Sequence, residues 1–227
     1  MTDRGVLALV GGAEWQPGCD FDAELLEASG GREVLVLPTA AAYERPEKAV
    51  ATAGSWFAHF GASVHGLMVL RHADACEPAN AQAVRSASFV YLGGGSPLHL
   101  LSVLKGSTVL EALEEAWRAG AVLAGSSAGA MVLADPMIDP RGGALTMGLG
   151  LVERLAVLPH HRTGSGHHLW RTLELAPADV VIAGIAERSA LIRGANGEWR
   201  IAGEGAVTLF REGREVGLET LPGRDAT

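Results

Sequence analysis

Short apolar runs alternate with stretches of helical spacing over the first half of the chain. The apolar runs are residues 5–10, 33–38, 64–70, 88–92 and 121–124. Apolar residues at consecutive positions are typical of strands that are buried on both faces. The stretches of helical spacing are residues 21–28, 46–60, 80–85, 98–104 and 108–118. Because strands and helices alternate, we expect a parallel sheet with helices on both faces.

The last fifty residues carry a different pattern. Their short apolar runs, at 180–185, 189–193, 199–202 and 206–210, are separated by glycine and asparagine turns. Asn196-Gly197 between two of these runs is a strong hairpin signal. We therefore predict antiparallel strands near the C-terminus that extend the sheet at one edge. Since neither a repeat nor a linker interrupts the pattern, the predicted fold is one three-layer α/β domain over residues 1–227, with a mostly parallel central sheet.

Composition and charge narrow the functional classes. The chain has 227 residues, of which 48% are hydrophobic, so it has ample material for a buried core. The net charge of −8 and the lack of a basic run disfavour nucleic acid as a partner. The two cysteines are far apart and suit free thiols in a reducing compartment. With no signal-peptide pattern at the N-terminus and no apolar segment of membrane-spanning length, we expect a cytoplasmic protein that does not enter a membrane.

The sharpest motif is Gly125-Ser126-Ser127-Ala128-Gly129, which matches G-x-S-x-G. It follows an apolar run and precedes a segment that can start a helix, and this strand–turn–helix context is what a nucleophile elbow needs. The pattern predicts Ser127 as the nucleophile of a serine hydrolase, with the Ala128 N–H pointing at the developing oxyanion. A plain glycine-rich turn is the alternative.

A second glycine-rich loop, Gly93-Gly94-Gly95-Ser96, directly follows the run at 88–92. The carboxyl ends of parallel strands meet at one edge of a sheet, where ligands bind. The loop lacks the Gly-Lys-Ser/Thr of a phosphate-binding Walker A motif. A loop that donates a second oxyanion N–H fits better, and a simple turn into the next helix is the alternative.

A serine nucleophile needs a base, and histidine is the usual one because its pKa lies near neutral pH. Of the eight histidines, four lie beyond Ser127: His160, His161, His167 and His168. His160 follows the apolar run at 155–158 and so should lie at the end of a strand. Zinc binding by part of this cluster is an alternative.

The base needs a carboxylate to orient it. The candidates after the nucleophile are Asp135, Asp139, Glu153 and Glu187. Glu187 follows the run at 180–185, again at the end of a strand. If Glu187 is the acid, the order is Ser, His, Glu, which differs from the Ser, acid, His order of α/β-hydrolases that Asp135 would give.

Six segments resemble those of one known family: LALVGGAEW, VLPTA, YLGGGSPLHLL, AGSSAGAM, LPHH and GIAERSAL. The family is that of the serine peptidases that includes cyanophycinase and aspartyl dipeptidase, with a fold similar to class I glutamine amidotransferases. The resemblance implies His160 as base and Glu187 as acid. It also implies an oxyanion hole made by the N–H groups of Gly94 or Gly95 and of Ala128.

The same resemblance implies a small aspartyl or isoaspartyl peptide as substrate and no cofactor or metal. Ser96 and His99 depart from the family's glycine-rich loop, and its spaced arginines are represented only by Arg162 and Arg171. We expect substrate-binding residues among Ser96, His161, Arg162 and Arg171. Two alternatives stand beside a peptidase: an amidase-like or esterase-like hydrolase of another small substrate, and a non-catalytic binding protein that keeps the fold. The sequence leaves the oligomeric state open, a homodimer included.

Overall fold

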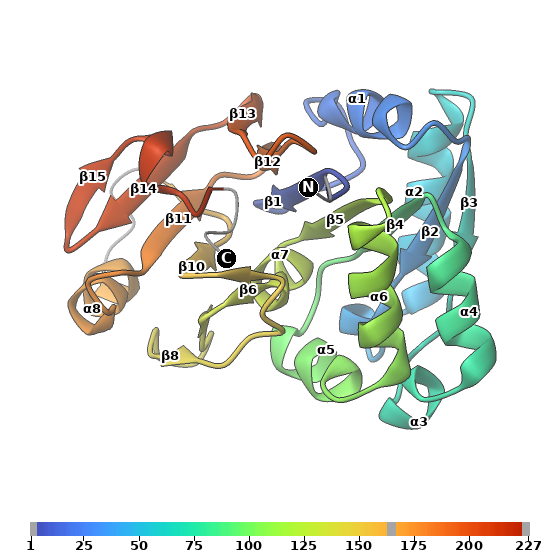
Figure 1. Cartoon of the computed structure of the whole chain (residues 1–227), viewed down its shortest axis with the longest axis horizontal. Helices are drawn as coiled ribbons and strands as arrows, with labels where there is room; N and C mark the ends of the chain where they lie inside the picture. The colour runs from blue at the N-terminus through green and yellow to red at the C-terminus, as the bar shows by residue number, and fades with distance from the viewer. Residues whose placement is uncertain (1–3, 163–166, 224–227) are drawn as a thin grey trace.

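A seven-stranded sheet forms the centre of the computed structural model, which describes residues 4–162 and 167–223 (Figure 1). Its strand order is β13-β12-β1-β5-β4-β2-β3. The strands are β1 (Leu7–Val10), β2 (Glu33–Leu37), β3 (Ser63–Gly66), β4 (Phe89–Leu92), β5 (Val122–Ser126), β12 (Ser189–Arg193) and β13 (Trp199–Gly203). The five strands from β1 to β3 in this order are parallel, whereas β12 pairs with β1 and β13 pairs with β12 in antiparallel fashion. The predicted mostly parallel central sheet is thus confirmed.

Helices cover both faces of this sheet because successive strand residues point to opposite sides. In β4, Phe89 and Tyr91 pack with α1 (Phe21–Ala28) and α2 (Pro46–Ala58). Val90 and Leu92 point to the other face. That face is covered by α3 (His72–Ala75), α4 (Pro78–Ser86), α5 (Pro97–Leu104), α6 (Thr108–Arg118) and α7 (Ala128–Leu133). The result is the expected three-layer α/β arrangement (Figure 1).

A second sheet of four strands lies beside the central one, in the order β10-β11-β14-β15 (Figure 1). It is built from β10 (Leu155–Leu158), β11 (Val181–Ile185), β14 (Val207–Arg211) and β15 (Arg214–Val216), and α8 (His167–Leu175) connects β10 to β11. The remaining strands form two small pairs, β6 (Ala134–Asp135) with β9 (Val152–Glu153) and β7 (Met137–Ile138) with β8 (Leu145–Thr146). Two short 3-10 turns, η1 (Thr39–Ala41) and η2 (Leu218–Thr220), complete the elements.

Two sequence expectations need correction. Only β12 and β13 extend the central sheet, through the predicted Asn196-Gly197 hairpin, because β12 occupies the free edge of β1 and leaves β11 and β14 to pair with β10 and each other. The run at 64–70 is a strand only as far as Gly66. The Asp74 carboxylate accepts the N–H groups of Leu70 and Arg71, so these amides start α3 instead of continuing the ladder.

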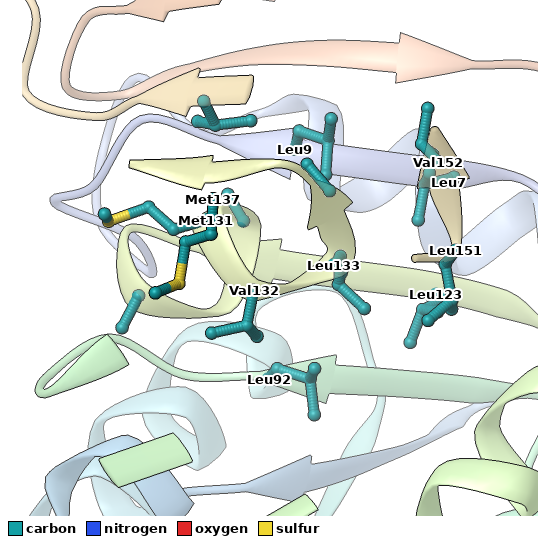
Figure 2. Close-up of a cluster of buried hydrophobic side chains, with 14 of the residues drawn as sticks. Leu7, Leu9, Leu92, Leu123, Met131, Val132, Leu133, Met137, Leu151 and Val152 are labelled. Carbon is teal, nitrogen blue, oxygen red and sulfur yellow. The ribbon is translucent and has the colours of Figure 1, made fainter. Parts of the chain in front are cut away.

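The helix that follows β5 is buried over its whole length. Figure 2 shows Met131, Val132 and Leu133 of α7 among apolar side chains from neighbouring strands, including Leu9 of β1 and Leu92 of β4. Dense packing of this kind holds a short helix rigidly. Within the described residues, no helix is long and apolar enough to cross a membrane.

Candidate active site

Ser127 lies at the sharp turn between β5 and α7. Its backbone has φ 48° and ψ −105°, a strained conformation that costs a non-glycine residue about 1–3 kcal/mol. A Cβ at Gly125 would lie 2.6 Å from the Gly129 carbonyl carbon, and a Cβ at Gly129 would clash with the Leu92 carbonyl oxygen. Both glycines of the motif are therefore required by close packing, and the turn they permit presents the Ser127 side chain at the carboxyl edge of the sheet.

His160 approaches Ser127 from the end of β10. The Ser127 Oγ and the His160 Nε2 are 3.0 Å apart, which is hydrogen-bonding distance. The ring lies against Gly12, where any Cβ would clash with its Cε1 atom. The glycine after β1 thus provides the space that the imidazole occupies.

Glu187 follows β11 and meets the other nitrogen of the same ring. Its Oε1 lies 2.9 Å from the His160 Nδ1. A carboxylate at Nδ1 favours the tautomer with the proton on that nitrogen, which leaves Nε2 free to accept a proton from a hydroxyl. Serine, histidine and glutamate therefore stand in one hydrogen-bonded line, as in a catalytic triad.

Three consecutive backbone carbonyls at the end of β1 position the segments that carry Ser127, His160 and Glu187. Val10 accepts the Ser127 N–H at 2.9 Å, and Gly11 accepts the His160 N–H at 2.7 Å. Gly12 accepts the N–H of Arg188, the neighbour of Glu187, at 2.9 Å. In the sequence, Gly11-Gly12 indicated only the end of a strand, so this role was missed.

Backbone strain also gathers here. Positive φ angles occur at Ser127 (48°), His160 (52°) and Arg188 (57°), none of which is glycine. Ala13 (52°) and Trp15 (60°), in the loop after β1, share this feature. Strained residues of this kind persist where the surrounding structure fixes them, and they cluster at functional sites.

The loop after β4 lies next to the nucleophile. A Cβ built on Gly94 would lie 3.6 Å from the Ser127 Cβ. The Gly94 N–H, one of the expected oxyanion donors, instead donates to the Glu14 Oε1 at 3.0 Å. Among the described residues, the N–H groups of Gly95 and Ala128 have no acceptor. These two amides are the donors left for an oxyanion.

Glu14 was not singled out in the sequence, although it follows the Gly-Gly turn by two residues. Its second oxygen, Oε2, accepts the Ser126 hydroxyl at 2.8 Å. One carboxylate therefore ties the β1, β4 and β5 loops together. The contact to Gly94 spans 80 positions, and no local pattern reveals it.

The charge of Glu14 acts on three buried polar side chains. Asp22 accepts a hydrogen bond from the Trp56 Nε1 at 2.9 Å, and burial raises the pKa of its carboxyl group to about 8, with the Glu14 charge adding to the rise. Burial likewise raises the pKa of Cys19 to about 11, with Asp22 and Glu14 contributing. Burial and the same acidic neighbours raise the pKa of Tyr91. These groups are neutral or acidic, and none of them supplies a positive charge to Glu14.

Two expected substrate-binding residues have structural partners. Ser96 caps α5 by accepting the His99 N–H at 3.3 Å. His161 is buried, with 6% of its surface exposed, and its ring packs against Phe210 with centroids 6.0 Å apart. Burial lowers the pKa of His161. The sequence predicted that His161 binds substrate, whereas the structure places its side chain in the packing of the second sheet.

Arg162 and Arg171 are exposed, and no ion pair joins either to an acidic side chain within the described part of the chain. Residues 163–166 of the expected cationic loop lie outside the described residues, as do the side chains of His167 and His168. Where side chains are described, no three His, Cys, Asp or Glu residues are grouped as a metal site requires.

The other candidate acids are engaged elsewhere. The Asp135 Oδ1 accepts the Gly148 N–H at 2.7 Å. Hydrogen bonds from Arg141 lower the pKa of Asp139 to about 2. Glu153, in β9, is exposed. The carboxylate that contacts His160 is that of Glu187.

Solved structures of two peptidases are similar to this chain. A crystal structure of a peptidase from an acI-B1 actinobacterium superposes with a TM-score of 0.85 at 30% identity, covering 94% of this chain and 93% of that one. A putative peptidase E protein from Listeria monocytogenes EGD-e shares the fold, with a TM-score of 0.62 at 20% identity, 92% of this chain and 98% of that chain being covered.

Among curated proteins, the cyanophycinase of Trichormus variabilis is 29% identical over 164 residues, which cover 67% of this chain and 55% of the relative. That of Synechococcus elongatus is 26% identical over 219 residues, covering 91% of this chain and 68% of the relative. The chain thus spans about half the length of the Trichormus enzyme. The profile of peptidase family S51 matches residues 7–197, a range that contains Ser127, His160 and Glu187. The protein therefore belongs to peptidase family S51.

Proposed function

We propose that the protein is a serine peptidase that hydrolyses small aspartyl or isoaspartyl peptides through Ser127, His160 and Glu187. One observation carries the proposal. The Ser127 Oγ lies 3.0 Å from the His160 Nε2, and the His160 Nδ1 lies 2.9 Å from the Glu187 Oε1. Nucleophile, base and orienting acid in contact are the arrangement that acyl transfer by serine requires.

The chemistry follows from these contacts. The Ser127 Oγ attacks the scissile carbonyl while the His160 Nε2 takes the hydroxyl proton, and Glu187 stabilises the imidazolium that forms. The N–H groups of Ala128 and Gly95 donate to the oxyanion of the tetrahedral intermediate. His160 then returns the proton to the leaving amine. Water hydrolyses the acyl-enzyme by the same proton transfers, which restores Ser127.

Substrate chemistry is inferred from the relatives and from charge. Similarity to cyanophycinases supports an aspartyl or isoaspartyl residue at the scissile bond. A substrate carboxylate requires cationic partners, and exposed Arg162 and Arg171 are free to supply planar, bidentate hydrogen bonds. Arg171, held in α8, is the first choice, and Ser96 in the glycine-rich loop offers a hydroxyl. A cytoplasmic location, where short peptides are available, is part of this proposal.

The test is hydrolysis of a panel of α-aspartyl, β-aspartyl, asparaginyl and leucyl dipeptides by the purified protein. We expect turnover of at least one aspartyl series and little turnover of leucyl peptides. Labelling by a fluorophosphonate, which reacts with activated serines, runs in parallel. Labelling without hydrolysis of any peptide would point to an amidase or esterase, and absence of both would contradict a hydrolase.

A further inference from the structure

Glu14 is held beside the reacting serine by contacts that leave little freedom. Its Oε1 accepts the Gly94 N–H at 3.0 Å and its Oε2 accepts the Ser126 hydroxyl at 2.8 Å. The residues on either side, Ala13 and Trp15, both have the positive φ angles given above. Strain maintained on both sides of a side chain indicates that its placement matters. Gly94, which Glu14 contacts, is also a neighbour of the Ser127 Cβ.

The charge of this carboxylate is not balanced within the described residues. No lysine, arginine or histidine forms an ion pair with Glu14 there. Its buried neighbours Cys19, Asp22 and Tyr91 are neutral or acidic, and its charge raises the pKa of each of them. Each carboxylate oxygen can accept more than the one hydrogen bond it receives. The Glu14 carboxylate can therefore accept a further hydrogen bond from a cationic donor.

An unbalanced carboxylate at this place opposes catalysis unless the substrate compensates for it. The intermediate carries a negative oxygen at the same loop, and two like charges in a partly desolvated site repel each other strongly. A substrate with a cation next to its scissile carbonyl would remove this repulsion. In an aspartyl dipeptide, the free α-ammonium group is attached one carbon from the scissile carbonyl, and in an isoaspartyl dipeptide it is two carbons away.

We propose that Glu14 binds the free α-ammonium group of the residue whose carbonyl Ser127 attacks, and so restricts the site to peptides with an unblocked amino terminus. This inference rests on the proposed peptidase function. Glu14 is a specificity-determining residue in this account, and its hydrogen bonds to Gly94 and Ser126 fix the position of its charge.

The experiment compares kcat/KM for H-Asp-Leu and for N-acetyl-Asp-Leu in the wild type, Glu14→Gln and Ser126→Ala. Glutamine has the shape of glutamate and can keep both contacts, because the Ser126 hydroxyl can turn and accept from the amide. Glu14→Gln therefore removes the charge and retains the loop. We expect it to lower kcat/KM for H-Asp-Leu about 100-fold and to raise kcat/KM for N-acetyl-Asp-Leu, because the neutral amide no longer repels the oxyanion of a substrate that lacks the ammonium group. Ser126→Ala keeps the charge and the Gly94 contact but removes one of the two hydrogen bonds to Glu14, so the preference for the free amine should remain and be smaller than in the wild type.

Equal losses on both substrates in Glu14→Gln would overturn the inference and make Glu14 a positioning residue. A wild type that hydrolyses both peptides equally well would overturn it too, while the peptidase function would stand. A binding experiment distinguishes a failure of this inference about Glu14 from a failure of the proposed peptidase function. Calorimetry of both peptides with Ser127→Ala and with Ser127→Ala/Glu14→Gln needs no turnover. Tighter binding of the free amine that disappears with Glu14→Gln would support the inference even if no peptide were hydrolysed, and equal binding would contradict it.

Discussion

Glu187 and His160 lie 27 positions apart in the chain, yet the glutamate Oε1 is 2.9 Å from the histidine Nδ1. Each side chain is about half exposed, at 50% and 49%. Because water competes for the partners of an exposed polar contact, this hydrogen bond contributes little to folding. Its effect is on the tautomer and orientation of the imidazole, so a change at Glu187 should be visible in catalysis and not in stability.

The first prediction concerns the choice of acid. Glu187→Gln should lower kcat by on the order of 10²–10⁴. An amide nitrogen facing the His160 Nδ1 favours the imidazole tautomer that carries its proton on Nε2, and in that tautomer Nε2 cannot accept the proton of the Ser127 hydroxyl. Asp135→Asn should keep most activity, since an asparagine oxygen can still accept the Gly148 N–H. Steady-state kinetics on an aspartyl dipeptide measure both. An active Glu187→Gln variant beside an inactive Asp135→Asn variant would reverse the assignment.

The second prediction separates two adjacent histidines. His160→Ala should lose as much kcat as removal of Ser127 while unfolding at the same denaturant concentration as the wild type, since residues that act as a unit give similar losses. His161→Ala should retain its kcat but lose about 2–4 kcal/mol of unfolding free energy, because its buried ring packs against Phe210. Urea titration measures the unfolding free energy of both variants, and steady-state kinetics measure their kcat. A stable but inactive His161→Ala protein would be incompatible with this account.

The third prediction concerns the pH dependence of stability. The pKa of Asp22 is 3.8 in an unfolded chain and about 8 in the fold. Between these values the folded state holds a proton that the unfolded state has lost, so the free energy of unfolding should fall as the pH rises from about 4 to 8. Asp22→Asn keeps an acceptor for the Trp56 Nε1 and removes the titration.

Urea titrations at pH 5 and pH 8 test this directly. The asparagine variant should gain more stability over the wild type at pH 8 than at pH 5, by no more than about 4 kcal/mol. The same difference between the two proteins at both pH values would show that Asp22 does not titrate in this window.

The fourth prediction concerns the acidic subsite. Arg171→Met should lower kcat/KM for an aspartyl dipeptide more than for its asparaginyl analogue, because only the aspartyl side chain carries a charge for the guanidinium to bind. Arg162→Met, at the second exposed arginine proposed for this subsite, is measured beside it to show which guanidinium binds the carboxylate. Equal effects on both substrates, or none, would leave Arg171 without a role in specificity.

Much of the fold could be predicted because it is encoded locally. The helices at 21–28 and 108–118 have the bounds that their spacing predicts, and the Asn196-Gly197 hairpin forms as expected. The separate sheet of β10, β11, β14 and β15 was not predicted, since which apolar run pairs with which is decided by tertiary packing.

The residues of the candidate site were likewise predictable only where the signal is local in the sequence. Ser127, His160 and Glu187 could be selected because each follows a strand, and strand ends of this kind converge at one edge. The carboxylate of Glu14 could not be placed, because its partner Gly94 is distant in sequence. The burial of His161 could not be foreseen either, since it depends on β14, some 50 positions later.

The central claim is that Ser127 is the nucleophile, and hydrolysis of an aspartyl dipeptide by Ser127→Ala tests it most directly. Ser126→Ala is the control, because this neighbouring serine is fully buried and its hydroxyl donates to Glu14 and not to the base. We predict that Ser127→Ala unfolds like the wild type and loses kcat by on the order of 10⁶, whereas Ser126→Ala remains a measurable enzyme. A Ser127→Ala variant with activity within about tenfold of the wild type would contradict the account.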